Sequence, residues 1–281
     1  VVVAVCDIIP CPANLIKKIA KNKNAIDDIF EKKNEEKESN KITYSANFEI
    51  LISSIFFPTQ INKKLLAVLI DPEKFAAENY SYFIEKLPEA VTHIFVGGST
   101  ATTAQSEVCV DFIKTKTNLP VILFPGDKEQ ITEKADGILL LSLISGRNPE
   151  YLIEQHIKAV PKLLNAGLEI IPTGYLLLDG GNQSAVARVS KTKPIQQDEI
   201  ELIKNTALAG EMLGKQLVYL EAGSGALIPV SEKVIAEVKR DLNIPLIVGG
   251  GIRNATQLKK AYKAGADLVV IGTAFENGEF K

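Results

Sequence analysis

Short runs of apolar residues alternate with amphipathic segments from Lys63 onward. Eight of these runs are rich in β-branched residues and predict strands: 65–70, 93–96, 121–124, 137–141, 169–173, 217–220, 246–248 and 268–271. Segments between them have helical spacing: 78–87, 104–116, 149–165, 198–213, 231–241 and 255–264. Near-continuous apolar strands that alternate with helices indicate a parallel sheet covered on its faces. Eight such units predict an α/β protein with a (β/α)₈ TIM barrel.

Two irregularities indicate a modified barrel. Between the third and fourth strands, residues 125–136 have room only for a turn or a very short helix. We therefore expect the third helix to be missing or replaced by coil. The printed sequence stops at Lys281, soon after the eighth strand, so we also expect the last helix to be truncated.

Residues 1–62 have a different pattern from the rest of the chain. The stretch 31–41 (EKKNEEKESNK) is dominated by charges and has no apolar residue, as in a solvated helix or a linker. We therefore predict an N-terminal extension over 1–62, partly disordered or helical and without an assigned function. The barrel domain is expected over 63–281.

Composition excludes several classes of function. The formal net charge is −2 and the pI about 5.9, with no recurring stripe of lysine and arginine, so nucleic-acid binding is not expected. The cysteines and histidines are scattered: Cys6, Cys11, Cys109, His93 and His156. This spacing excludes a disulfide framework and disfavours structural zinc. The first apolar run is too short for a membrane span and lacks a preceding basic region, so we predict a cytoplasmic protein.

Glycines follow the last two predicted strands, at Gly249–Gly251 and Gly272–Thr273. In a TIM barrel the active site lies at the C-terminal ends of the strands, and the loops after strands seven and eight commonly bind phosphate. Glycine lets backbone N–H groups approach an anion closely. The alternative is that these glycines only form tight turns. The pattern predicts a phosphate site, but it identifies no reaction.

Two carboxylates are candidates for chemistry. Glu221 follows the sixth strand beside a Gly-Ser-Gly loop, where it suits the hydroxyls of a sugar or polyol; the alternative is a solvated loop acid. Asp71 ends the first strand, and Ser99 follows the second. One carboxylate with a hydroxyl suits Mg²⁺, which also takes water and substrate oxygens. Both residues are equally suited to cap helices, so spacing alone leaves the metal open.

Seven motifs in order resemble one family: LIDPEKF, FVGGST, SLISGRNPEYLI, IPTGYLLLDGG, YLEAGSGA, IVGGGIR and IGTAFE. Over Leu65–Phe280 the chain closely resembles the geranylgeranylglyceryl phosphate synthases, or PcrB-like family, which are modified barrels without a proper third helix. The resemblance implies a Mg²⁺-dependent prenyltransferase that joins a prenyl diphosphate to the C3 hydroxyl of sn-glycerol 1-phosphate. Leu69, two residues before Asp71, is similar to the family's second branch, which mostly uses a geranylgeranyl donor.

The resemblance also implies roles for individual residues. Asp71 and Ser99 correspond to the Mg²⁺ ligands, and Glu221 to the residue on the glycerol hydroxyls, so Glu221 and Asp71 are the expected catalytic residues. The implied contacts to glycerol phosphate are Tyr219, Leu220, Glu221, Ala222, Gly223, Ser224, Gly225, Gly250, Gly251, Gly272 and Thr273. A homo-oligomer and, at most, peripheral membrane contact through the lipid substrate are also implied.

Two other functions remain compatible with the residues. Another phosphate-binding barrel, acting as an isomerase or synthase on a small sugar phosphate, explains the glycines and Glu221. It does not explain the apolar residues beside the fourth and fifth strands, which we expect to form a groove at the barrel mouth. A non-catalytic phosphate- or lipid-binding barrel is the third possibility. The sequence leaves the length of the prenyl chain open.

Overall fold

The computed structural model describes residues 55, 63–74, 84–98 and 101–280. Within these residues eight parallel strands close into a barrel in sequence order, with each strand paired to the next and β8 paired to β1. The strands are β1 (Leu65–Ile70), β2 (His93–Val96), β3 (Val121–Leu123), β4 (Gly137–Leu143), β5 (Glu169–Leu177), β6 (Leu217–Glu221), β7 (Leu246–Gly249) and β8 (Leu268–Ile271). The predicted TIM barrel is confirmed.

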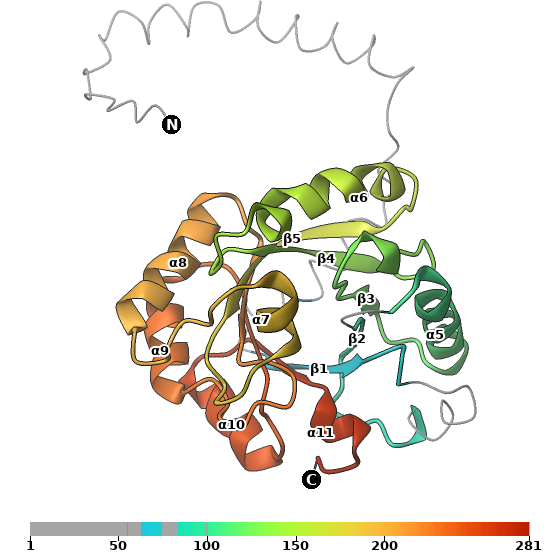
Figure 1. Ribbon diagram of the computed structural model, residues 1–281. Coiled ribbons are helices and arrows are strands. Elements are labelled where there is room, and N and C mark those ends of the chain that lie inside the picture. The colour runs from blue at the N-terminus through green and yellow to red at the C-terminus, as the bar shows by residue number, and fades with distance from the viewer. Residues whose placement is uncertain (1–54, 56–62, 75–83, 99–100, 281) are drawn as a thin grey trace, which may run out of the picture. The chain divides into compact units, whose positions relative to one another are not determined.

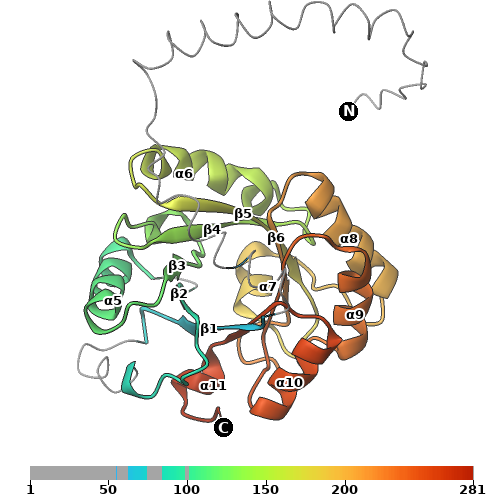
Figure 2. The same ribbon diagram turned by 180° about the vertical axis from the view of Figure 1, so that it is seen from behind.

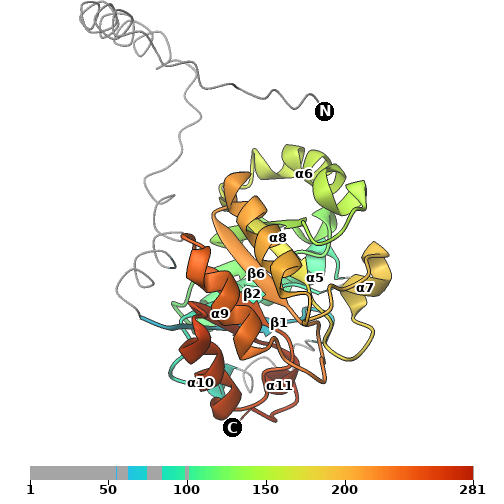
Figure 3. The ribbon, with the colours of Figure 1, turned by 90° about the vertical axis from the view of Figure 1, so that its left-hand side faces the viewer.

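Helices surround the barrel in Figure 1, and Figure 3 shows them from the side. The longer helices are α5 (Thr103–Lys116), α6 (Gln155–Leu163), α8 (Ile200–Met212), α9 (Glu232–Asp241) and α10 (Ala255–Ala264). The short ones are α7 (Ala185–Ser190), α11 (Thr273–Glu276), the 3₁₀ turn η2 (Lys128–Gln130) and the π-helical turn η3 (Glu150–Glu154). Figure 1 faces the barrel end at which α7 lies, and Figure 2 faces the opposite end. None of the described helices is long and apolar enough to cross a bilayer.

Local sequence signals explain where the helices begin. Thr102 caps α5 in a capping box with Gln105, and Ser231 accepts a hydrogen bond from an amide in the first turn of α9. Asn254 caps α10 in the same way, and Gly265 ends that helix with a positive φ. Because these caps satisfy free backbone groups at the ends, α5, α9 and α10 begin and end close to the predicted positions. Most of the predicted helix over 78–87 lies outside the described residues.

Side chains that alternate along each strand divide the core into two layers. One set points into the barrel, for example Ala67, Phe95 and Leu139, and the other packs under the helices. Ile55 is fully buried in the inner set, although it lies within the expected extension of residues 1–62. The barrel belongs to a compact unit over Asn47–Lys281. Apart from Ile55, the expected extension lies outside the described residues, and its domain boundary stays a prediction.

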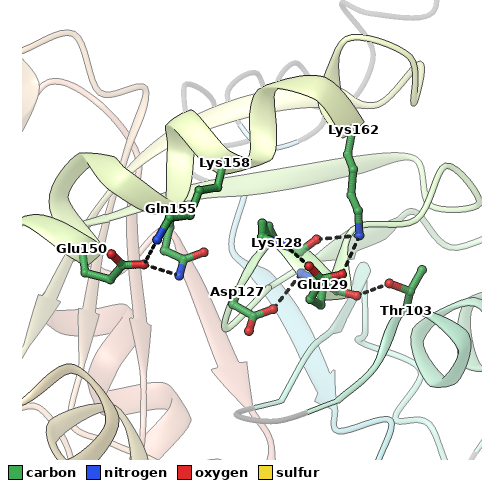
Figure 4. Close-up of polar contacts among 8 residues, drawn as sticks. All are labelled: Thr103, Asp127, Lys128, Glu129, Glu150, Gln155, Lys158 and Lys162. Atoms are coloured by element: carbon green, nitrogen blue, oxygen red, sulfur yellow. Dashed lines mark hydrogen bonds and ion pairs between the residues drawn. The ribbon is translucent and has the colours of Figure 1, made fainter.

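The expected loss of the third helix is confirmed, since only η2 stands between β3 and β4. Figure 4 shows how this turn is held between its neighbours. Asp127 caps it by accepting a hydrogen bond from the Glu129 amide (2.7 Å). Lys162 of α6 donates to the Lys128 carbonyl (3.2 Å), and the Thr103 hydroxyl of α5 donates to the Glu129 carbonyl. The turn therefore bridges α5 and α6 without covering the sheet as a full helix would.

Two strands, β4 and β5, extend by two residues or more past their predicted ends. The expected end of the fifth strand at Thr173 is wrong, because β5 continues to Leu177, and β4 continues to Leu143. Residues 173–175 pair with β4 and β6 inside the sheet. Glu221 is likewise the last residue of β6 and does not lie in the following loop. Pairing with β4 and β6 on both sides keeps the backbone extended past Thr173, including at Gly174.

Candidate active site

A cavity of about 550 Å³ opens at the C-terminal ends of the strands. Its polar wall comes from the loops after β1, β6, β7 and β8, and its apolar wall from β4, α6 and α7. These members of the predicted site line the cavity: Asp71, Tyr219, Glu221, Ser224, Gly225, Gly250, Gly251, Gly272 and Thr273. Residues that are far apart in the sequence are thus brought to one place by the closure of the barrel.

Three predicted residues lie elsewhere, and one is not described. The side chains of Leu220 and Ala222 are buried in the outer apolar layer, away from the cavity. They alternate with Tyr219 and Glu221, as the pleat of a strand requires. Gly223 contributes its amide to Glu221 and does not line the cavity. Ser99 lies outside the described residues.

Glu221 is a buried carboxylate at the centre of the site, with 7% of its surface exposed. Its Oε1 accepts a hydrogen bond from the Gly223 amide at 2.6 Å. Burial raises the pKa of the Glu221 carboxyl, and the Tyr219 hydroxyl and the Gly223 amide oppose that shift only in part. The fully buried Tyr219 hydroxyl has no hydrogen-bond partner of normal geometry among the described residues. The Glu221 carboxylate and the Tyr219 hydroxyl therefore lie beside one another at the cavity wall, both next to the Cβ position of Gly249.

Glycines after β7 leave space for this carboxylate. A Cβ built on Gly250 would lie 2.6 Å from Glu221 Oε1 and 2.7 Å from the Gly223 nitrogen, and Gly250 has φ +83°. A Cβ on Gly249 would overlap the Tyr219 hydroxyl. These glycines were predicted to serve phosphate binding. The structure adds a second reason for them, because any larger residue would displace the catalytic candidates.

We expect Gly250→Ala to cost about 3 kcal/mol of unfolding free energy, from the positive φ and from crowding against Glu221. Gly214→Ala is the matched control, since Gly214 also has φ +83° but nothing lies within 4 Å of its Cβ position. The control should lose only about 1 kcal/mol. Urea unfolding of both variants measures the difference. Equal losses would contradict crowding at Glu221.

Asp71 forms the second acidic position of the site. Its side chain is 18% exposed, and its Oδ1 accepts a hydrogen bond from the Glu73 amide at 3.1 Å. The carboxylate lies against the backbone of Gly98 at the end of β2, where a Cβ would overlap it. Within the described residues no group of three His, Cys, Asp or Glu side chains could hold a metal. One carboxylate fits Mg²⁺ held jointly with water and substrate oxygens, and does not fit a metal held by protein alone.

The glycine-rich loops meet on the same polar wall of the cavity. The hydroxyls of Ser224 and Thr273 lie 3.1 Å apart, which joins the loop after β6 to the start of α11. Gly250 and Gly251 line the same wall. Arg253 also lines the cavity, and its guanidinium donates to the Ala226 carbonyl at 2.6 Å. Hydroxyls, glycine backbone and a nearby cation are suited to an anionic group such as a phosphate.

The expected apolar groove extends from the barrel mouth toward α6. Phe124, Tyr175 and Tyr219 contact one another with ring centroids 5.4–6.0 Å apart. Beyond them, both faces of β4 line the cavity, with Leu139 from the inner face and Ile138 from the outer. No full helix stands next to this outer face between β3 and β4, where the chain forms only η2. Ala159 of α6 and Val186 of α7 complete the apolar wall.

Gln130 was missed by the sequence analysis. Its buried side chain accepts a hydrogen bond from the Gly126 amide (3.0 Å) and donates one to the Gly98 carbonyl (2.8 Å). It therefore ties η2, beside the apolar groove, to the end of β2, against which Asp71 lies. No local motif marks such a residue, since its partner Gly98 lies 32 residues away, after a different strand.

Comparison with known proteins places these features in one family. The PcrB family model matches residues 59–281. A geranylgeranylglyceryl phosphate synthase of Zunongwangia profunda is 95% identical over 231 residues, which cover 82% of this chain and 99% of the relative. That of Flavobacterium johnsoniae is 54% identical over 216 residues, covering 76% and 89%.

Solved structures agree with this result. The synthase of Thermoplasma acidophilum, in complex with its substrate sn-glycerol-1-phosphate, matches with a TM-score of 0.76 and 37% identity, over 80% of this chain and 91% of that one. The enzyme of Thermoplasma volcanium matches with a TM-score of 0.73 and 37% identity, over 80% and 90%. Both share the barrel described above.

Proposed function

The chain belongs to the PcrB family, and from this membership we infer that it is a geranylgeranylglyceryl phosphate synthase. It transfers a geranylgeranyl group from geranylgeranyl diphosphate to the C3 hydroxyl of sn-glycerol 1-phosphate and releases diphosphate. The structural observation that best supports this inference is the composition of the cavity. Glycine-rich loops suited to bind a phosphate, a buried carboxylate and a long apolar wall line the same cavity.

We propose that the acceptor, sn-glycerol 1-phosphate, binds on the polar wall. Its phosphate would lie against the hydroxyls of Ser224 and Thr273 and the backbone of Gly250 and Gly251. This places the glycerol hydroxyls near Glu221, whose buried carboxylate accepts hydrogen bonds from them. The complex of the Thermoplasma acidophilum enzyme with sn-glycerol-1-phosphate supports this acceptor.

The donor would place its prenyl chain along the apolar wall and its diphosphate toward Asp71. In the reaction the acceptor oxygen forms a bond to C1 of the prenyl group, and the bond from C1 to the diphosphate oxygen breaks. Glu221 accepts the proton of the attacking hydroxyl. The rings of Phe124 and Tyr175 limit access of water to the reacting carbon. Holding both substrates in one cavity makes the transfer effectively unimolecular.

The proposal includes Mg²⁺ at the end of β1. Asp71 would hold the ion together with water and diphosphate oxygens, and Ser99 is the second proposed ligand. The chemistry such an ion supplies is neutralisation of the charge that develops on the leaving diphosphate. Asp71 itself is fixed by the Glu73 amide and by the backbone of Gly98, so its carboxylate is oriented in advance.

A homo-oligomer is also proposed. Four apolar side chains at helical spacing are exposed on one face of η3 and α6: Ile153, Ile157, Val160 and Leu164. A contiguous apolar stripe of this kind is typical of a protein interface. Light scattering coupled to gel filtration should give a mass above the 30.5 kDa of one chain. A monomer at all concentrations would contradict this part of the proposal.

The function is tested by incubating the protein with geranylgeranyl diphosphate, Mg²⁺ and either sn-glycerol 1-phosphate or its 3-phosphate enantiomer. We expect the prenyl ether product from the 1-phosphate alone, and none after addition of EDTA. Absence of product from either enantiomer, in a sample shown to be folded, would favour a sugar-phosphate enzyme or a non-catalytic barrel. Product formation that persists in EDTA would contradict only the metal.

A further inference from the structure

Lys74 and Glu276 form a charged group with Asp71 at one corner of the cavity. The Lys74 ammonium donates to Glu276 Oε2 at 2.8 Å and lies 3.5 Å from Asp71 Oδ2. The other oxygen of Glu276 accepts a hydrogen bond from the Asp71 amide at 3.2 Å. One carboxylate from α11 therefore holds both the end of β1 and the ammonium that follows it. All three residues line the cavity.

The charges at this corner would repel the donor if Lys74 were absent. The Glu276 side chain is only 9% exposed, and Asp71 is the proposed Mg²⁺ ligand next to it. Two carboxylates this close to the expected position of a diphosphate raise the cost of binding an anion. The Lys74 side chain is 53% exposed and carries three donors, of which Glu276 uses one. Lys74 thus keeps donors available for a ligand.

The other described cations of the cavity wall are engaged differently. Arg253 directs its guanidinium to the carbonyls of Ala226 and Gly251 on the acceptor side. Lys128 pairs with Glu129 on the η2 turn, as Figure 4 shows. Among these cations, Lys74 is the one that contacts Asp71. The corner where the diphosphate is expected therefore has its own cation.

We propose that Lys74 binds the diphosphate of the prenyl donor, and that Glu276 is the positioning residue that holds Lys74 beside Asp71. This inference rests on the proposed function and assigns two residues to its donor subsite. The ammonium offsets the two carboxylates before the donor binds, and then forms charge-assisted hydrogen bonds to diphosphate oxygens. Glu276 prevents the flexible lysine stem from leaving the corner.

Helix α11 also connects the two proposed substrate subsites. Thr273 begins the helix in the proposed cradle for the acceptor phosphate, and Glu276 ends it at the donor corner. Four residues thus connect the two substrate subsites through one rigid turn. Changes at Glu276 should act on the donor first, because its direct contacts are to Lys74 and to the end of β1.

The test compares Lys74→Met, Lys74→Arg and Glu276→Gln with Lys158→Met. Lys158 is the matched control, a surface lysine paired with Glu150 away from the cavity. Isothermal titration with inorganic diphosphate in the presence of Mg²⁺ measures the subsite without turnover. Steady-state kinetics give separate KM values for the donor and for glycerol phosphate, and thermal melting reports the fold.

We expect Lys74→Met to weaken diphosphate binding and to raise the KM of the donor by about tenfold or more, as for loss of a charge-assisted hydrogen bond. The KM of glycerol phosphate should stay within about twofold. Lys74→Arg should retain most of the diphosphate affinity. Glu276→Gln should lower the diphosphate affinity several-fold, because a neutral amide holds the Lys74 ammonium more weakly, and this loss of positioning outweighs the relief of repulsion from one carboxylate. Lys158→Met should behave as the wild type.

Wild-type diphosphate affinity in a folded Lys74→Met variant would overturn the proposal. If Lys74→Met does not fold, Glu276→Gln provides the test, since its side chain keeps an acceptor for the Asp71 amide. Unchanged diphosphate affinity in Glu276→Gln would then overturn the proposal. Failure of the proposed prenyl transfer and failure of the proposed role of Lys74 give different results. Wild-type protein that makes no prenyl ether defeats the proposed function, whereas an active wild type with an unaltered donor KM in Lys74→Met defeats only this inference.

Discussion

Glu221→Gln is expected to lower kcat by about 10²- to 10⁴-fold, the range typical for loss of a positioned general base. Glutamine has the same shape, and its carbonyl oxygen can still accept the hydrogen bond from the Gly223 amide. It has no carboxylate to take the proton of the attacking hydroxyl. The fold should be retained, because nothing in the packing around β6 changes.

The measurement is the rate of prenyl ether formation at saturating substrates, with thermal melting as the check on folding. Glu279→Gln is the matched control, since Glu279 also lines the cavity and the change removes the same charge. The control should keep a rate close to that of the wild type. Turnover of Glu221→Gln within a few-fold of the wild type would rule out Glu221 as the base.

The pH dependence follows from the same residue. Burial raises the pKa of the Glu221 carboxyl, so its basic form is populated only above the range of an ordinary glutamate. We expect kcat/KM to fall as the pH is lowered through this raised pKa. In Glu221→Gln this fall of kcat/KM at low pH should disappear. Because the folded pKa exceeds the unfolded one, the contribution of Glu221 to stability decreases as pH rises between the two values. The glutamine variant should lack this decrease.

Asp71→Asn is expected to lower activity by about 100-fold or more, because an amide replaces the carboxylate proposed to hold Mg²⁺. Asparagine can still accept the hydrogen bond from the Glu73 amide, so the turn after β1 should persist. Inorganic diphosphate should also bind more weakly in the presence of Mg²⁺. Rates across a Mg²⁺ series and calorimetric titration with diphosphate measure the two effects.

Asp127→Asn provides the control for this experiment. Asp127 lines the cavity on the side of η2 and caps that turn, a role that asparagine fills equally well. Its rate and its Mg²⁺ dependence should match the wild type. If Asp71→Asn keeps the wild-type response to Mg²⁺, the ion is held elsewhere and the proposed ligand is wrong.

Prediction of the fold from the sequence succeeded where the signal was local. The apolar runs that became β1, β2 and β8 have the predicted bounds, because buried parallel strands need a nearly continuous apolar stretch. The short segment between β3 and β4 also indicated that a helix was missing. Prediction failed at β5, where the predicted strand ends at Thr173, because pairing with both neighbours keeps the strand extended to Leu177.

The candidate site likewise has features that the sequence predicts and features that depend on tertiary contacts. The sequence by itself determined the barrel, the strand ends and the residue types that follow them, because hydrophobic periodicity and chain topology place every such residue at one end of the barrel. Only the tertiary structure decided which side chains meet. Glu221 lies so close to Gly250 that no Cβ fits there. Gln130 binds the backbone at the end of β2, and Glu276 holds Lys74 beside Asp71. These contacts join segments up to about two hundred residues apart, and they depend on barrel closure and on side-chain packing, which no local pattern records.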